Sequence, residues 1–266
     1  STIAALTVTI YDPATIITSA LPTGVVGGPY STSLTATGGD SAFAWSLIAG
    51  VLPAGLTLDA AGLLSGAPTA SGTAAFTVEV TTGDGQTTTA ALTVTIYEPI
   101  TIVTAVLPSG VVGIPYSTSL VATGGDGTFT WSLVTGPLPI GLTLDSSGLL
   151  AGTSTALGGV TFTVEVTTGD GQTTNAAVTV TTYDPVLIVT AALPDGAVGT
   201  RYSTSLAATG GDGAFGWSLL AGPLPTGLTL DPSGLLSGTP TATATAAPLT
   251  FQTVTGDGQT ASVNLA

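Results

Sequence analysis

An internal repeat of 86 residues constrains this chain more than any other feature of its sequence. The three tryptophans follow one another at that spacing, as Trp45, Trp131 and Trp217. Units of this length can each bury a core of their own, unlike solenoid repeats of about 20–45 residues. We therefore divide the chain into a leading segment and three domains, at residues 1–11, 12–97, 98–183 and 184–266.

The composition leaves few kinds of chemistry open. The chain contains no Cys or His, Arg201 is its one basic residue, and its 15 acidic residues give a net charge of −14. This charge excludes attraction to nucleic acid. Without His, Cys or Lys, no Ser-His, Cys-His or Ser-Lys pair can activate a nucleophile. Paired carboxylates for glycoside hydrolysis need two different environments, whereas nearly every acid here recurs from repeat to repeat. We expect a protein that is not an enzyme.

The sequence also bears on where the protein works. No run of 18 or more apolar residues is present, so no membrane insertion is expected. The start of the sequence lacks an intact signal peptide, which is expected of a processed product or of a window cut from a longer chain. Poverty in Lys, Cys and His beside abundant Thr, Gly and Ala is typical of exported proteins. We therefore expect an extracellular or cell-surface location.

Seven strands are predicted in each repeat, and no segment has the periodicity of a helix. In the middle repeat they are Ile100–Leu107, Tyr116–Ala122, Phe129–Val134, Leu142–Leu144, Leu149–Ala151, Thr161–Thr167 and Thr174–Tyr183. Short strands with frequent turn signals and a Trp on the third strand are typical of an immunoglobulin-like β-sandwich. The Asp-Gly step within residues 169–172 predicts a hairpin with a type I′ turn. The expected fold is all-β, with tandem immunoglobulin-like or cadherin-like sandwiches of seven strands.

The junctions between repeats carry a recurring proline. They read Tyr-Asp-Pro at residues 11–13, Tyr-Glu-Pro at 97–99 and Tyr-Asp-Pro at 183–185. Proline fixes φ and pushes the preceding residue into an extended conformation, so these linkers are short and stiff. Because no Gly/Ser linker separates the domains, we expect a rod.

Several motifs carry a family resemblance. Each repeat contains Ala-Thr-Gly-Gly, Trp-Ser-Leu and Gly-Leu-Leu-x-Gly, and the most specific block is Leu-Pro-x-Gly-Leu-Thr-Leu-Asp, at Leu52–Asp59, Leu138–Asp145 and Leu224–Asp231. Together they resemble the putative Ig (He-PIG, cadherin-like) domain of bacterial surface proteins. The resemblance implies an extracellular β-sandwich used in adhesins, stalks and enzyme spacers, and it implies no catalytic site. The third repeat departs most from the pattern: Arg201 replaces a proline, and an insertion precedes Leu249.

The two ends of the sequence do not match the repeat. Residues 1–11 alternate apolar and Thr side chains like the last strand of a repeat, but no domain precedes them. Residues 260–266 align with the last strand of the other repeats but lack the counterpart of 94–97. One hypothesis is that residues 1–11 of one molecule complete the third repeat of the next, which gives a head-to-tail filament. The assembly residues would be Leu6, Val8, Ile10, Val263 and Leu265.

An alternative explanation of these ends is that the sequence is a window of a longer repeat chain. A further observation limits the filament hypothesis: residues 1–7 and 260–266 align with the same seven positions, so both cannot fill one place unless one is displaced. From sequence alone, both interpretations stay open.

Acidic residues recur in the turns near the junctions. In a seven-strand sandwich three of these turns lie at the pole where the first strand enters, and Ca²⁺ takes carboxylate and carbonyl oxygens. The sequence thus offers interdomain calcium candidates, although Asp is also a common turn residue and no D-x-D string is present. The candidates are Asp12, Asp40, Asp59, Asp84, Glu98, Asp126, Asp145, Asp170, Asp184, Asp212, Asp231 and Asp257.

Two other residue types allow a binding interpretation. The tryptophans could form a platform for sugars, but each lies two positions from a Phe on the same face of an apolar strand, which favours core packing. The outward Thr side chains could carry O-linked glycans, but β-propensity and solubility explain them as well. From sequence we therefore expect a structural stalk or filament subunit that self-associates head to tail. The alternative is an adhesin or carbohydrate-binding array whose partners are surface glycans or host receptors.

Overall fold

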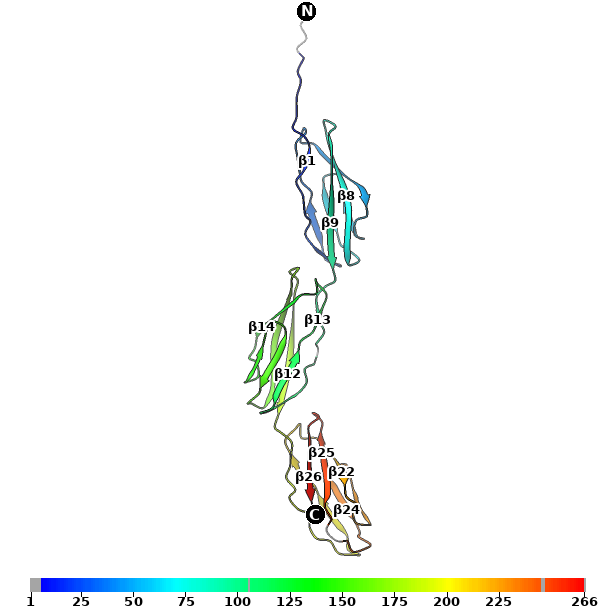
Figure 1. Cartoon of the computed structure of the whole chain (residues 1–266), viewed down its shortest axis with the longest axis vertical. Coiled ribbons are helices and arrows are strands. Elements are labelled where there is room, and N and C mark those ends of the chain that lie inside the picture. The colour runs from blue at the N-terminus through cyan, green and yellow to red at the C-terminus, as the bar shows by residue number, and fades with distance from the viewer. Residues whose placement is uncertain (1–5, 105, 245–246, 266) are drawn as a thin grey trace, which may run out of the picture. The chain divides into compact units, whose positions relative to one another are not determined.

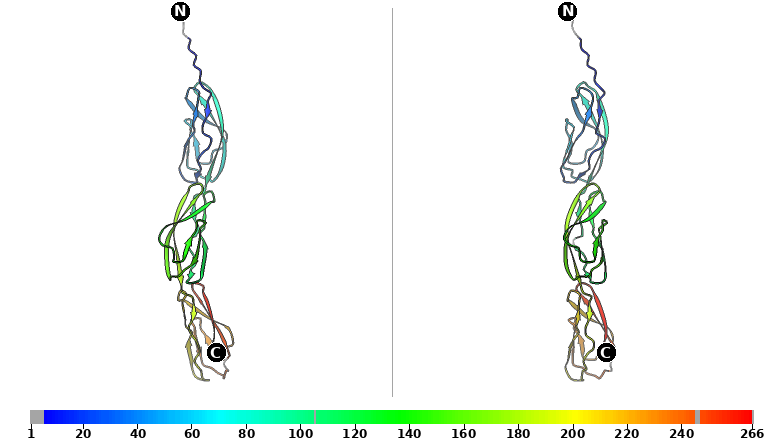
Figure 2. Two further views of the ribbon diagram at one scale, coloured as in Figure 1. Left: turned by 60° about the vertical axis from the view of Figure 1, so that its left-hand side comes forward. Right: turned by 90° about the vertical axis from the view of Figure 1, so that its left-hand side faces the viewer.

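The computed structural model describes residues 6–104, 106–244 and 247–265, and every regular element in these ranges is a β-strand. Figure 1 shows β8 beside β9 in repeat 1 and β25 beside β26 in repeat 3, and Figure 2 gives two further views. The chain forms two compact units. The first contains repeat 1 with residues 121–130 and 166–174 of repeat 2, and the second contains repeat 3 with most of the remainder of repeat 2. The expectation of an all-β immunoglobulin-like fold is confirmed.

Repeat 1 has two main sheets and one small strand pair. The order is β2-β9-β8-β5 in the four-stranded sheet and β3-β7-β6 in the three-stranded sheet, and β1 pairs with β4. The strands are β1 (Thr15–Ile16), β2 (Gly24–Val25), β3 (Tyr30–Ser33), β4 (Ala36–Thr37), β5 (Phe43–Gly50), β6 (Leu56–Leu58), β7 (Leu63–Gly66), β8 (Gly72–Thr82) and β9 (Thr87–Tyr97).

Repeat 2 repeats this topology. Its sheets are β11-β18-β17-β14 and β12-β16-β15, with β10 paired to β13. The strands are β10 (Thr101–Ile102), β11 (Gly110–Val111), β12 (Pro115–Ser119), β13 (Ala122–Thr123), β14 (Phe129–Thr135), β15 (Leu142–Leu144), β16 (Leu149–Thr153), β17 (Gly158–Thr168) and β18 (Thr173–Tyr183). The last five lie within a few residues of the predicted strands.

Repeat 3 differs in the sheet that corresponds to the four-stranded sheet of the other repeats, which has three described strands. Here the order is β22-β25-β26, with β20-β24-β23 as the second sheet and β19 paired to β21. The strands are β19 (Leu187–Ile188), β20 (Tyr202–Ser205), β21 (Ala208–Thr209), β22 (Phe215–Ala221), β23 (Leu228–Leu230), β24 (Leu235–Gly238), β25 (Leu249–Thr255) and β26 (Thr260–Leu265).

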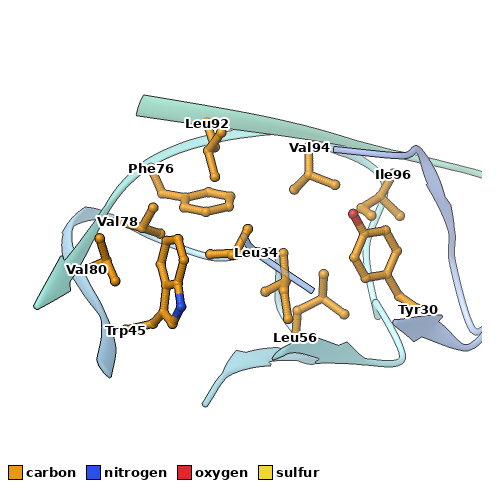
Figure 3. Close-up of a cluster of buried hydrophobic side chains, with 11 residues drawn as sticks. Tyr30, Leu34, Trp45, Leu56, Phe76, Val78, Val80, Leu92, Val94 and Ile96 are labelled. Atoms are coloured by element: carbon orange, nitrogen blue, oxygen red, sulfur yellow. The ribbon is translucent and has the colours of Figure 1, made fainter. Parts of the chain in front are cut away.

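Alternating side chains of the two sheets form the core of each repeat. Along β8 the residues Phe76, Val78 and Val80 are buried while their neighbours are less so, as expected for strands with one face covered. Figure 3 shows these side chains facing Trp45 and Leu56. Because the chain has no cysteine, apolar packing takes the place of the disulfide found in antibody domains.

The predicted first strand of repeat 2 is much shorter in the structure, and a further strand, β11, lies beyond its predicted end. Its start, β10, pairs antiparallel with β13, whereas β11 pairs parallel with β18 through Gly110↔Thr182 and Val111↔Tyr183. The prediction of one strand over Ile100–Leu107 is therefore wrong. The chain changes sheets near Pro108, whose missing N–H cannot continue a ladder.

The hairpin between the last two strands of each repeat is confirmed, but its turn type differs from the prediction. In repeat 2, Gly171 N–H donates to Thr168 O at 3.0 Å. Gly171 has a φ of +89°, whereas Asp170 is not among the residues with positive φ. A type I′ turn needs positive φ at both central residues, so this loop is a type I turn followed by a left-handed glycine, the usual three-residue hairpin.

Thr253 on β25 places an unsatisfied hydroxyl in the core of repeat 3. It is 0% exposed and lies opposite Trp217, where repeat 1 has Val80 opposite Trp45. Among the described residues, its Oγ1 is the one buried side-chain polar atom without a hydrogen-bond partner.

Replacing Thr253 with valine is expected to raise the free energy of unfolding of repeat 3 by about 1–2 kcal/mol, because the desolvated hydroxyl disappears at nearly constant volume. Urea denaturation followed by circular dichroism measures this change. The control is Thr255→Val, which removes a buried hydroxyl that donates to Gln259 O at 3.2 Å and should therefore destabilise the repeat. A loss of stability in Thr253→Val would contradict the prediction.

Candidate functional site

A glutamine fastens the entry segment of each repeat to the hairpin between its last two strands. In repeat 1, Gln86 Nε2 donates to Asp12 O at 3.3 Å and to Asp84 Oδ2 at 2.7 Å, and Gln86 Oε1 accepts from Ala14 N–H at 3.0 Å. The junction is therefore held by the backbone of its Asp and not by the carboxylate. Gly39 N–H adds a second hydrogen bond to Asp12 O, at 2.8 Å.

The same contacts recur in the other two repeats. Gln172 Nε2 donates to Glu98 O at 3.2 Å and Asp170 Oδ2 at 2.8 Å, and Gln259 Nε2 donates to Asp184 O at 3.0 Å and Asp257 Oδ2 at 2.7 Å. This glutamine was not predicted from sequence, although it follows Gly-Asp-Gly in every repeat. That recurrence was the signal that could have found it.

The structure brings together some of the calcium candidates. Asp40 Oδ1 accepts from Gly83 N–H at 2.8 Å, which joins its turn to that of Asp84. The corresponding pairs are Asp126 with Asp170, through Asp126 N–H to Asp170 Oδ1 at 3.3 Å, and Asp212 with Asp257, through Asp212 N–H to Asp257 Oδ1 at 3.2 Å. The predicted proximity of these two turns is thus observed.

In the third acidic turn of each repeat, the carboxylate is hydrogen-bonded within the turn itself. Asp59 accepts from Leu63 N–H at 2.8 Å, Asp145 accepts from the Ser147 hydroxyl at 2.6 Å, and Asp231 accepts from Ser233 N–H at 2.9 Å, all within their own turns. The hydrogen bond from Ser147 lowers the pKa of Asp145. In the ranges that the structure describes, no three acidic side chains form a group that could hold a metal ion. The calcium hypothesis thus stays a prediction that these contacts do not support.

A tyrosine in each repeat is hydrogen-bonded to the segment that precedes it. Tyr30, Tyr116 and Tyr202 each donate their hydroxyl to a proline carbonyl oxygen eight residues earlier, at 3.0 Å in all three repeats. Tyr30 and Tyr116 are buried, and burial raises the pKa of Tyr116 to about 12. Tyr202 is more exposed than its two counterparts.

Raising the pH from about 10 to about 12 is expected to destabilise repeat 2. The unfolded state loses the Tyr116 proton near the ordinary tyrosine pKa of 10.0, whereas the folded state keeps it to about 12. The stability that protonated Tyr116 contributes is therefore fully present below the pKa of the unfolded state. It is lost as the pH rises through the pKa of the folded state. Denaturation curves across this range measure the effect, and Tyr116→Phe should flatten its share of the pH dependence. An unchanged slope in that variant would contradict the assignment.

The tryptophans do not form an exposed platform. Trp45, Trp131 and Trp217 are 6%, 4% and 6% exposed. Their rings pack in the core, which confirms the core interpretation over the sugar-binding one. A platform that stacks on a sugar needs an open ring face, and these rings offer none.

Residues 6–11 expose an apolar side chain at every second position. Leu6, Val8 and Ile10 are 94%, 84% and 90% exposed. Residues 1–5 of the predicted strand lie outside the described residues, and residues 6–11 belong to none of the described sheets. A strand is defined by its pairing, so this segment has the pattern of a strand without a sheet.

A groove of about 480 Å³ opens in repeat 3. It lies between the segment after Leu193 and the start of β25, and its apolar walls include Tyr202, Leu228, Leu236 and Leu249. Val263 and Leu265 on β26 pack against the same core from one side. Of the predicted assembly residues, these two are thus built into repeat 3, and the other three lie on the exposed segment.

Repeat 1 shows what fills the equivalent space. There Val94 and Ile96, each 1% exposed, pack against Tyr30 and Leu56 (Figure 3). Described strand β26 ends at Leu265, which pairs with Leu249 as Leu92 pairs with Phe76 in repeat 1. The groove therefore occupies the positions that follow this pair along the strand.

Comparison with known proteins identifies the kind of domain. The family described as the putative Ig domain matches residues 12–97, 98–183 and 184–266. No curated protein sequence is similar enough to count as a match. A search for long apolar helices in the described ranges finds none that could cross a membrane.

Similar solved structures are tandem arrays. An I-band fragment of titin is 11% identical, with 96% of this chain and 98% of that chain covered and a TM-score of 0.42. Extracellular domains 3–5 of Drosophila OTK are 13% identical, with 96% and 98% covered and a TM-score of 0.40. The EC1–4 fragment of Drosophila N-cadherin is 14% identical, with 92% and 73% covered and a TM-score of 0.34.

Proposed function

This chain belongs to the putative Ig domain family over all three repeats, and from that premise we propose that it is a non-catalytic extracellular protein whose copies join head to tail into a filament. The leading segment of one copy adds a strand to repeat 3 of the next. Tandem immunoglobulin-like domains are typical of rod-like and adhesive extracellular proteins, which supports the structural part of the proposal.

One observation carries the assembly part. The groove in repeat 3 occupies the place that Val94 and Ile96 fill in repeat 1, and the exposed segment carries Val8 and Ile10 in the same pattern. Burying a Val or Ile side chain contributes about 1.5–3 kcal/mol. Strand addition in general also supplies main-chain hydrogen bonds. Because donor and acceptor belong to different parts of one chain, each added copy brings a new free acceptor, so the contact can be repeated from copy to copy.

The test compares the 266-residue chain with a variant that lacks residues 1–11. Electron microscopy and light scattering should show fibres for the 266-residue chain and folded monomers for the variant, with circular dichroism confirming the fold. The net charge of −14 makes copies repel, so association should strengthen as salt is raised above the low millimolar range. Fibres that persist without residues 1–11 would overturn strand donation.

The second candidate is a cell-surface adhesin that works as a monomer. It is favoured if the 266-residue chain stays monomeric at every salt concentration and binds glycans on an array. That outcome would also overturn the filament proposal.

A further inference from the structure

We propose that the docking strand enters repeat 3 in one register, in which Val8 and Ile10 of the second copy fill the groove and Leu6 stays outside it. This inference rests on the proposed head-to-tail assembly and specifies which side chains make the contact. It also removes the conflict between residues 1–7 and 260–266, which align with the same positions.

Leu6 is the residue that stays outside the groove, because the position it would take in repeat 3 is already occupied by another side chain. Leu6 aligns with Leu92, and in repeat 3 the place of Leu92 is already taken by Leu265, which is 3% exposed. The open positions are those of Val94 and Ile96, which align with Val8 and Ile10. The donated strand thus continues β26 end to end, and β26 is not displaced.

The segment of repeat 3 that corresponds to β2 is consistent with the same register. In repeat 1, β2 runs parallel to β9, with Gly24 opposite Ile96 and Val25 opposite Tyr97. The corresponding residues of repeat 3 are Gly196 and Ala197, and Gly196 lines the groove. In this register Gly196 lies opposite Ile10, and Ala197 lies opposite Tyr11.

Glycine at this position leaves room for the isoleucine. A Cβ added at Gly24 would lie 2.7 Å from Ile96 Cδ1, which is too close for any other residue to be accommodated without a shift. A Cβ added at Gly196 would meet Tyr202 at 3.1 Å as its nearest described neighbour. Repeat 3 therefore keeps the space that Ile96 requires, with no isoleucine of the described chain inside it.

Matched charge substitutions on the exposed segment test the register. Ile10→Asp should lower the association constant at least about 100-fold, because a carboxylate would replace an apolar side chain in a groove that also carries the carboxylate of Asp195. Leu6→Asp should change it by no more than about threefold. Both residues are about equally exposed in the free chain, so neither substitution is expected to disturb folding.

Cross-linking gives a second readout, since the natural chain has no cysteine. Tyr11→Cys with Ala197→Cys should form disulfide-linked multimers under mild oxidation. Thr9→Cys with Ala197→Cys, which tests a register shifted by two residues, should not. If the natural chain forms no multimers, the proposed function fails. If it forms multimers but Leu6→Asp weakens them as much as Ile10→Asp, or the shifted pair cross-links, the register fails and head-to-tail assembly stands.

Discussion

Replacing Trp131 with alanine is expected to lower the free energy of unfolding of repeat 2 by about 3–5 kcal/mol. The ring is 4% exposed, and no disulfide supports the two sheets around it. Its loss leaves a cavity between them that the remaining side chains fill only in part. Urea denaturation of the 266-residue chain, followed by far-UV circular dichroism, should show the transition of one repeat displaced to lower urea.

The control is Leu133→Ala on the same strand, because Leu133 is 41% exposed. Its truncation should cost less than about 1 kcal/mol. Equal losses from the two substitutions would mean that Trp131 is not the centre of the core.

Replacing Gly148 with alanine should destabilise repeat 2 by about 1–3 kcal/mol more than replacing Gly171. Both glycines have a φ of +89°, so the backbone strain of an added Cβ is the same at the two sites. A Cβ at Gly148 would lie 2.7 Å from Trp131 Cδ1 and Nε1, whereas a Cβ at Gly171 would have no atom within 4 Å. The difference between the variants therefore isolates the clash with the ring.

The measurement is the same urea titration, with Gly171→Ala as reference. A clash that pushes the indole out of place should also change its near-UV circular dichroism, which Gly171→Ala should leave unaltered. The prediction fails if the two variants unfold at the same urea concentration.

The strands and the core could be predicted from sequence, because both follow from the alternation of apolar and polar residues. Phe162, Val164 and Val166 are fully buried as their spacing predicts, and β15 begins and ends at its predicted residues. The short β10 and the separate strand β11 could not be predicted from sequence. They depend on which sheet offers a free edge near β11, and that is a property of the whole sandwich.

The candidate site could be predicted in part. Topology correctly placed Asp126 and Asp170 together, because two turns at one pole of a sandwich are close. For Asp145 the sequence left two uses open, and the carboxylate is used within its own turn, because short polar side chains bond readily to nearby N–H and O–H groups. The mismatched strands pointed to repeat 3, but part of the groove lining, including Pro194, Pro223 and Ala242, comes from loops whose path no periodicity encodes.

The parallel pairing of β11 with β18 has a mechanical consequence. In the proposed filament, tension would pull the entry and exit of each repeat in opposite directions, and parallel neighbouring strands would then have to slide past each other. Their hydrogen bonds, including Val112 N–H to Tyr183 O at 2.9 Å, bear the load together and do not open one after another. In the described part of repeat 3 no such pair holds β26. In the head-to-tail assembly proposed above, the docked strand would give repeat 3 the parallel pairing that repeats 1 and 2 have within their own chain.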